Sequence, residues 1–312
     1  MTTNKLLLFF ILLFSPLITH AQIDACAARL PITLTVSSEL SSTVPSASIG
    51  FYTEMQNTSA DLISDATLAV EVVQKDTGTI VSRFVVLQPV TVFPNSSGKV
   101  GFVWKVPLNV NSGEYTVMVT FVPMGGSRAE AFAHVYPTAS RDVTISNGGA
   151  MPASVRALTV NGNIYTPDTV ARVAKEGHVS AIAAASNDIQ GPYKGAVVWR
   201  LYAPDATLSD QPIDTHEQSV GLHPQQSANI QYDLPALTLD SYYLEGELSD
   251  GHSTSYFDIL LAREDGAFAW TKCLTTSTTP KNGSGNVIVV VSLIAAVIVI
   301  GVLWEIAQRR RA

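Results

Sequence analysis

Catalytic and metal-binding signatures are missing from this sequence. It contains no Gly-x-Ser-x-Gly, His-Glu-x-x-His or Cys-x-x-Cys pattern and no phosphate-binding loop. Only two of its 312 residues are cysteine, and two thiolates are too few to form a zinc site on their own. We therefore expect a protein that is not an enzyme, with no catalytic residue, no cofactor and no metal site.

Histidine is also scarce, and its placement fits no metal-ligand template. His216 and His223 fall in a polar stretch with three nearby carboxylates, so a metal or calcium site is one interpretation. Their spacing matches no ligand pattern, and we favour a solvated loop. Asp250-Gly251-His252 is a second calcium candidate, but Asp-Gly between alternating strands is far more often a hairpin turn.

Basic residues are in short supply outside the two ends. Of the 19 Lys and Arg residues, 15 lie in 22–286, against 25 of the 26 Asp and Glu residues, so this stretch carries a net charge of −10. Nucleic-acid binding needs clustered Lys and Arg that contact phosphates, and anionic lipid headgroups attract basic surfaces. We therefore expect no nucleic-acid partner, and we interpret the acidic surface as one that keeps the protein soluble.

The N-terminus has the layout of a secretory signal peptide. Lys5 precedes an unbroken apolar run over 6–14, Pro16 then breaks the helix, and small residues lead up to Ala21. The apolar run makes only about 14 Å of helix, which is too short for a hydrocarbon core of about 30 Å. We expect residues 1–21 to be cleaved after Ala21 rather than kept as an anchor.

The C-terminus carries the strongest single signal, an uncharged apolar stretch over 287–304. Eighteen residues rise about 27 Å as a helix, enough to span a bilayer. Trp304 stands where an interfacial aromatic residue would, and a basic tail, 305–312, follows with Arg309, Arg310 and Arg311. The positive-inside rule places this tail in the cytoplasm. We expect a single-pass protein of the cell membrane whose body lies outside and whose partner is the lipid bilayer through 287–304.

The two cysteines lie near opposite ends of the outside part. Outside the cytoplasm Cys26 and Cys273 would tend to form a disulfide, although pairing between molecules and free thiols remain alternatives. Acylation of Cys26 is disfavoured because Asp24 lies just before it, well past the apolar run. After Cys273, the Thr- and Ser-rich stretch 274–286 reads as a flexible stalk.

The outside part alternates apolar and polar residues in short runs, which predicts strands with one buried face. In 99–106, for example, Val100, Phe102 and Trp104 share one face. Seven such runs fit an antiparallel β-sandwich over 22–137. The expected strands are 30–37, 47–56, 67–74, 80–87, 99–106, 114–121 and 128–136.

The same series of runs then returns, which predicts a second sandwich over 155–273. Residues 67–74 align with 195–202 at an offset of 128, and 112–121 align with 239–248 at an offset of 127. Between the copies, 138–154 is rich in Ser, Thr, Gly and Ala and is expected to be a linker. The predicted fold is therefore all-β, with two tandem antiparallel sandwiches and one C-terminal transmembrane helix.

Two short motifs bear a resemblance to a known family. Gly113-Glu114-Tyr115 and Asp240-Ser241-Tyr242 resemble the turn into the sixth strand of immunoglobulin-like and fibronectin-III-like domains. In those domains a "tyrosine corner" hydroxyl pins the loop, which implies that role for Tyr115 and Tyr242. The second copy departs from the pattern by carrying Asp240 where glycine would stand, and neither copy has the Cys–Trp–Cys pattern of antibody domains. The resemblance implies a bacterial-style surface module and no particular chemistry.

These observations favour a non-enzymatic, membrane-anchored protein of the cell envelope. Its two Ig-like modules would bind an extracellular protein or glycan, or would serve as an accessory subunit of an envelope complex. A structural spacer with no ligand of its own is the alternative, and an enzyme built on scattered carboxylates is a third.

Overall fold

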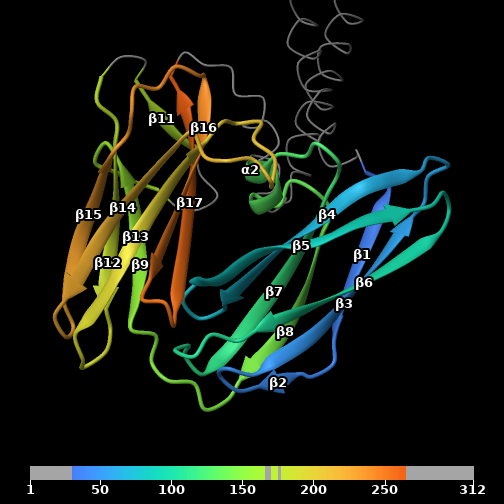
Figure 1. Ribbon diagram of the computed structural model, residues 1–312, viewed down its shortest axis with the longest axis horizontal. Coiled ribbons are helices and arrows are strands. Elements are labelled where there is room, and N and C mark those ends of the chain that lie inside the picture. Colours follow the sequence, from blue (N-terminus) through green and yellow to red (C-terminus); the bar gives the residue numbers. More distant parts are fainter. Residues whose placement is uncertain (1–29, 166–169, 175–176, 265–312) are drawn as a thin grey trace, which may run out of the picture. The chain divides into compact units, whose positions relative to one another are not determined.

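The computed structural model describes residues 30–165, 170–174 and 177–264 (Figure 1). Among these residues no helix is both long and apolar enough to cross a membrane. Several predicted features lie outside the described residues: the signal peptide 1–21, Cys26, Cys273, the stalk 274–286, the transmembrane helix 287–304 with Trp304, and the tail 305–312 with its three arginines.

The described chain is almost entirely β-structure, in agreement with the predicted all-β class (Figure 1). Its first part contains β1 (Ile32–Ser38), β2 (Ser42–Thr43), β3 (Ser48–Asn57), β4 (Ile63–Gln74), β5 (Ile80–Val92), β6 (Ser97–Lys105), β7 (Gly113–Val122), the short helix α2 (Arg128–Phe132) and β8 (Thr138–Ile145). Its second part contains β9 (Ala153–Val160), β10 (Asn163–Tyr165), β11 (Val170–Val173), β12 (Ser180–Asn187), β13 (Tyr193–Tyr202), β14 (Asp214–Leu222), β15 (Ser227–Asp233), β16 (Ser241–Ser249) and β17 (Thr254–Arg263).

The first part folds as two sheets that share one core, and we call it the first sandwich. One sheet has the order β1-β3-β6, and the other runs β5-β4-β7-β8-β2. Side chains alternate strictly between core and solvent along β3, as the sequence pattern predicted. Phe51 stacks on Phe102 with ring centroids 5.2 Å apart, and Trp104 packs beside Tyr115 in the same core.

The second part repeats this arrangement, and we call it the second sandwich. Its sheets have the orders β10-β9-β12-β15 and β14-β13-β16-β17. Trp199 and Phe257 meet edge to face in its core, with centroids 5.0 Å apart. In each sandwich a short strand also pairs in parallel with the last long strand: β2 with β8 in the first, and β11 with β17 in the second.

A buried asparagine marks the same place in both sandwiches. Asn57 at the end of β3 and Asn187 at the end of β12 are each at most 1% exposed. The Asn57 side-chain amide donates to the carbonyl of Asp61 at 2.7 Å, and the Asn187 amide donates to that of Gly191 at 2.8 Å. Each amide therefore closes a five-residue turn, and each also donates to a buried strand carbonyl, that of Val92 at 3.3 Å or that of Leu222 at 3.4 Å. The two asparagines lie 130 positions apart in the chain.

The alignment of the two copies at an offset of 128 is out of register in the middle strands. It matched Val70 with Val198, but Val70 faces the first core whereas Trp199, not Val198, faces the second. A slip of one residue exchanges the two faces of a strand. The pairing of β4 with β5 is irregular between Ile63 and Leu68, which changes the spacing in a way that alternation alone does not reveal.

Two expected elements differ in the structure. The predicted strand over 128–136 is wrong, because α2 begins there: Ser127 Oγ accepts from the backbone N–H of Glu130 at 3.2 Å as an N-cap. The Ser-x-x-Glu spacing is a capping-box signature, which the alternation obscured. The first half of the expected linker 138–154 is also structured, because β8 pairs with β7 over Thr138–Ile145.

The two sandwiches contact each other, and their larger sheets join at one point. Tyr256 of β17 and Ile80 of β5 form a single antiparallel bridge, which links nine strands in the order β14-β13-β16-β17-β5-β4-β7-β8-β2, with β11 pairing beside β17. All described residues belong to one compact unit. Among the described residues, the buried charged side chains Glu71, Arg83 and Glu245 all lie where the sandwiches meet.

Candidate functional site

The residues singled out from the sequence lie in structural rather than reactive positions. The Tyr115 hydroxyl donates to the backbone oxygen of Asn111 at 2.8 Å, and the Tyr242 hydroxyl accepts from the backbone N–H of Leu239 at 2.6 Å. Both hydroxyls thus bind the loop that precedes their own strand. Burial raises the pKa of Tyr115, so it stays protonated and keeps donating at physiological pH.

The calcium and metal candidates are not brought together. His216 stacks on Tyr232 with ring centroids 5.3 Å apart, and Asp250 accepts from the backbone N–H groups of His252 and Ser253 within its own turn. No three His, Cys, Asp or Glu side chains gather as a metal site within the part of the chain that the structure describes.

The junction between the sandwiches has its own small core. It combines outward-facing residues of the two larger sheets with residues of α2 and the loop after β13. Half of its ten buried members are alanine, so the junction buries far less apolar side chain than either sandwich core. Its members are Ala69, Val122, Ala129, Ala131, Phe132, Tyr202, Ala206, Tyr243, Leu260 and Ala262.

A cluster of charged side chains is buried beside this core, and we call it the ionic cluster. Its centre is Arg83 of β5, whose side chain is only 2% exposed. On its own sandwich Arg83 makes a two-pronged ion pair with Glu71 of β4, with Nε 2.7 Å from Oε1. The cluster consists of Glu71, Arg83, Arg128, His134, Tyr243, Glu245 and Asp258.

Arg83 also reaches across to the second sandwich. Its guanidinium nitrogens lie 3.5 Å from the Glu245 carboxylate, 3.2 Å from the Asp258 carboxylate and 3.2 Å from the Tyr243 hydroxyl. Its flat face lies over the Phe132 ring of α2, with 4.3 Å between Cζ and the ring centroid. One buried guanidinium thus contacts both sandwiches and the helix between them.

Arg128 and His134 complete the cluster from the segment that contains α2. Arg128 Nε donates to Glu245 at 2.8 Å, which makes a second ion pair across the junction. His134 Nε2 lies 2.8 Å from Glu71, and its Nδ1 lies 2.9 Å from the Thr120 hydroxyl. His134 takes a left-handed backbone conformation with φ of 53°, which aims its ring back at the sheet.

Three buried carboxylates share two guanidiniums in this cluster, and their pKa values diverge. Burial would raise the pKa of Glu71, but Arg83 and the neighbouring imidazole outweigh it and hold that pKa below its ordinary value. Burial would likewise raise the pKa of Glu245, but the charges of Arg83 and Arg128 outweigh it and hold that pKa below its ordinary value. Burial raises the pKa of Asp258 above its ordinary value, because Arg83 only partly offsets it and the Glu71 charge adds to it.

Sequence reasoning missed this cluster, although a signal was present. Within the predicted strands 67–74 and 80–87, Glu71 and Arg83 are the single charged residues, where a solvated strand would carry polar residues at every second position. Such isolated charges indicate a second buried face. Their partners Glu245 and Asp258 follow more than 150 residues later, so no local pattern connects them.

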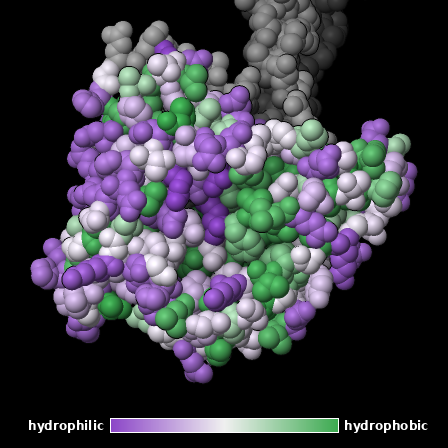
Figure 2. All heavy atoms as spheres, in the orientation of Figure 1, coloured by the Kyte–Doolittle hydropathy of each residue, from purple (hydrophilic) through white to green (hydrophobic). Residues whose placement is uncertain are grey.

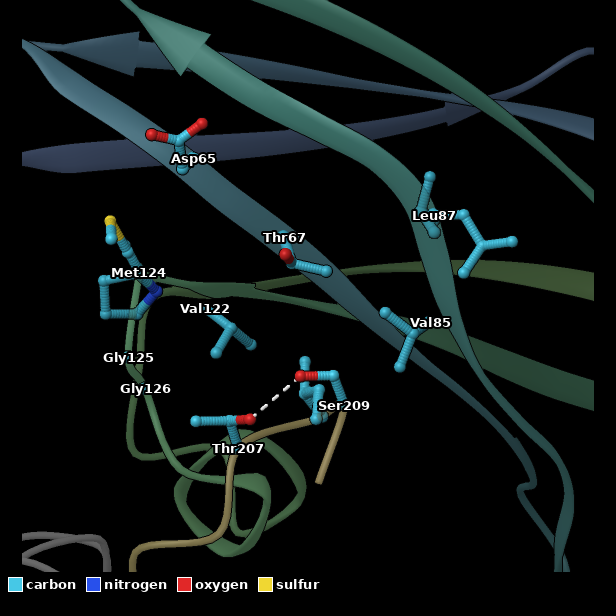
Figure 3. Close-up of a pocket in the computed structure, with 13 residues that line it drawn as sticks. Asp65, Thr67, Val85, Leu87, Val122, Met124, Gly125, Gly126, Thr207 and Ser209 are labelled. Atoms are coloured by element: carbon cyan, nitrogen blue, oxygen red, sulfur yellow. Dashed lines mark hydrogen bonds between the residues drawn. The ribbon is translucent and has the colours of Figure 1, made fainter. Parts of the chain in front are cut away.

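A pocket of about 410 Å³ opens beside the junction (Figure 3). Its floor is the outer face of β5, β4 and β7, which contributes Val85, Leu87, Thr67 and Val122. The turn at 123–126 forms one wall and the loop at 207–209 of the second sandwich forms another (Figure 3). Asp65 is the only charged residue among those that line it.

The pocket rim exposes apolar side chains to solvent. Leu87 is 93% exposed and Met124 is 74% exposed. Figure 2 shows apolar surface over β4 and β5 in this region. Val122 belongs to the pocket and also to the junction core, so the apolar surface is a continuation of an interface that is already formed. Exposed apolar patches of this kind mark interaction sites in soluble domains.

The 207–209 wall is tied to the ionic cluster. Thr207 and Ser127 form an isolated antiparallel β-bridge, and the backbone N–H of Arg128 donates to the carbonyl of Ala206 at 2.6 Å. The Arg128 guanidinium also donates to the carbonyl of Leu208 at 3.4 Å while it pairs with Glu245. The position of this wall therefore depends on the residues that join the sandwiches.

A second, polar surface covers the outer face of β1-β3-β6. Tyr52 is 39% exposed there, its hydroxyl donates to Glu39 at 2.9 Å, and the Lys99 ammonium lies 5.1 Å from its ring centroid. A Cβ atom on Gly101 would come within 3.5 Å of the Tyr52 ring, so this glycine leaves room for the ring to lie across the neighbouring strand. A shallow depression of about 280 Å³ adjoins the ring.

No protein-family model matches the sequence, and no curated protein matches it. Among solved structures, a red sea bream transglutaminase is similar over 74% of this chain and 31% of its own, at 12% identity and a TM-score of 0.27. The CARDB domain of a Pyrococcus furiosus protein, solved in complex with di-metal ions, is similar over 40% of this chain and 97% of its own, at 13% identity and a TM-score of 0.26.

The alkylpurine DNA glycosylase AlkC of Pseudomonas fluorescens, bound to DNA containing an abasic site analog, is similar over 37% of this chain and 30% of its own. Its identity is 9% and its TM-score 0.29. This chain thus spans less than a third of the transglutaminase and of the glycosylase. Similarities at such TM-scores carry nothing about activity.

Proposed function

We propose that this chain is a single-pass protein of the cell envelope that binds another protein through the pocket at the junction of its two Ig-like sandwiches. Residues 287–304 would cross the bilayer, the body would lie outside, and the basic tail would lie in the cytoplasm. The sandwiches present a surface and carry no chemistry. The observation that carries the proposal is the pair of exposed apolar residues, Leu87 and Met124, at the rim of a pocket continuous with a formed interface.

The composition of the pocket favours a protein ligand. Protein interfaces bury apolar anchors in a central pocket, and the floor here offers aliphatic side chains with a single carboxylate, Asp65, at the rim. We expect the partner to place a bulky apolar side chain in the pocket with a basic residue near Asp65. An accessory subunit of an envelope complex would use such a site.

Photocrosslinking in intact cells tests this function. Benzoylphenylalanine replaces Leu87, and the matched control carries it at Ile164, which is 74% exposed on β10 of the second sandwich. We expect a discrete adduct with one partner from position 87, absent from position 164 and lost when Asp65→Lys is added. No adduct at 87, or the same adducts at both positions, would favour a spacer without a ligand.

A glycan is the second candidate ligand, favoured by the exposed Tyr52 ring on the outer face of β1-β3-β6. Aromatic rings offer apolar faces on which sugar rings stack, and Glu39 and Lys99 supply hydrogen-bonding groups beside it. A glycan microarray with the full chain in detergent, compared with the Tyr52→Ala variant, tests this candidate. Binding that does not depend on Tyr52 would count against it.

A further inference from the structure

We infer that the ionic cluster acts as a clasp, which fixes the second sandwich against the first and thereby holds the 207–209 wall of the pocket in position. Arg83 and Arg128 are its positioning residues. This inference rests on the proposed use of the pocket as a docking site, and it concerns how that site is built.

The apolar contacts of the junction are too few to set an orientation by themselves. Half of the buried junction core is alanine, and small side chains slide past one another with little loss of contact. Backbone pairing across the junction adds only two single bridges among the described residues, Ile80 with Tyr256 and Ser127 with Thr207. Another interaction must therefore fix how the second sandwich is oriented against the first.

The buried charges of the ionic cluster fix the orientation of the second sandwich against the first. Arg83 contacts Glu245, Asp258 and Tyr243 of the second sandwich within 3.5 Å, and its side chain is almost excluded from water. Any rotation of the second sandwich would leave a buried guanidinium or carboxylate without its partner, which is strongly unfavourable. Apolar contacts tolerate small rotations, whereas this network does not.

The wall of the pocket follows the clasp because the same residues hold both. Arg128 pairs with Glu245 through its side chain, and it binds Ala206 through its backbone and Leu208 through its guanidinium. Ser127 bridges Thr207 one residue earlier. If the second sandwich turns away, the wall at 207–209 leaves the sheet face on which Val85 and Leu87 lie.

Hydrogen–deuterium exchange on the full chain in detergent micelles tests the clasp. The variant Arg83→Met removes the central charge. The matched control is Arg156→Met, because Arg156 of β9 forms an ion pair with Asp188 outside the junction and its side chain is 48% exposed. We expect exchange at 205–211 and 127–134 to rise at least tenfold in R83M. The core strands β3 and β12 should stay protected in both variants, and R156M should match the parent chain.

A second variant covers the case in which R83M leaves its carboxylates unpaired and unfolds. Glu71→Leu combined with Arg83→Met removes one charge of each sign, so the Arg128–Glu245 pair stays intact and Asp258 keeps the Tyr243 hydroxyl as its donor. The clasp predicts protected cores with fast exchange at 205–211. Unchanged exchange at 205–211 would overturn the inference, and so would loss of protection in β3 and β12 in both variants, because the cluster would then be a general stability element.

The two proposals fail in different ways. The exchange measurement needs no partner, so it decides the clasp even when the Leu87 crosslinking yields no adduct. If both proposals hold, R83M should lower the yield of the Leu87 adduct several-fold and R156M should not. If the adduct persists undiminished in R83M while 205–211 exchanges fast, the pocket is still a docking site, but the ionic cluster does not control it.

Discussion

The cores of the two sandwiches are filled with large aliphatic and aromatic side chains, whereas the junction between them is filled with alanines and charged groups. The cores repeat each other, with Asn57 matched by Asn187 and Tyr115 by Tyr242. The ionic cluster has no such repeat, because each sandwich supplies different members. A fold can be copied with its core, but joining two copies required new residues on the faces that meet.

Of the substitutions that distinguish the junction from the cores, Arg83→Met should have the largest effect on stability. It leaves Glu71, Glu245 and Asp258 with one guanidinium between them, and breaking a buried pair in this way costs about 3–5 kcal/mol. Because the loss falls on the junction, hydrogen exchange at 205–211 measures the change, while β3 and β12 stay protected. A loss below about 1 kcal/mol would mean that water reaches the cluster.

Replacing either buried asparagine should lower the stability by a similar amount, because each makes the same hydrogen bonds in its own sandwich. Asn57→Ala and Asn187→Ala each remove the amide that donates to a turn carbonyl and to a buried strand carbonyl, and we expect each to lower the free energy of unfolding by about 2–3 kcal/mol. Urea denaturation of the full chain in detergent measures each change. A large loss in one copy with none in the other would contradict the equivalence of the two sandwiches.

The tyrosine hydroxyls should make a smaller contribution. Tyr115→Phe removes the bond to the Asn111 carbonyl and Tyr242→Phe removes the acceptor for the Leu239 N–H, at about 1 kcal/mol each. Thermal denaturation followed by circular dichroism resolves a shift of this size. If neither midpoint moves, these hydroxyls do not hold their loops.

The smallest effect, and the only gain, is expected from Asp258→Asn. Because the pKa of Asp258 is raised in the folded protein, its folded state favours the protonated form and loses stability as the pH rises through that pKa. Asparagine resembles the protonated form at every pH. The variant should therefore be slightly more stable than the parent at pH 7, and this gain should vanish on acidification toward pH 4.

Glu245→Gln is the control with the opposite sign. The pKa of Glu245 is lowered, so the ionised form stabilises the fold above its ordinary titration range and that stability is lost on acidification. Glutamine should thus lower the thermal midpoint at pH 7 and have little effect at low pH. Equal responses of the two variants would contradict the division of charge within the cluster.

Much of the fold could be predicted from the sequence because it depends on local alternation. The strand around Trp104 was predicted in this way, since period-two burial is visible within eight residues. The two tyrosine motifs came instead from their resemblance to a known family. The helix at Arg128–Phe132 was missed because its five residues are too few to show helical periodicity. Its Ser127 cap was the only local sign.

The candidate site could not be predicted, for a different physical reason. Arg83 meets Glu245 and Asp258 only because two distant sheets face each other, and no spacing within one chain segment encodes that contact. The pocket is likewise lined from both sandwiches. The sequence contained one sign of the site: isolated charged residues at 71 and 83, within predicted strands that are otherwise mostly apolar.

The most direct test of this account is a disulfide across the junction. Ile80 and Tyr256 are direct antiparallel partners, a spacing that a disulfide can bridge. With Cys26 and Cys273 changed to serine, the pair Ile80→Cys and Tyr256→Cys should crosslink rapidly under mild oxidation in the full chain, and Arg83→Met should slow this several-fold. A crosslinking rate equal to that of the distant pair Ile80→Cys and Ile164→Cys, or one that Arg83→Met leaves unchanged, would contradict a clasped junction.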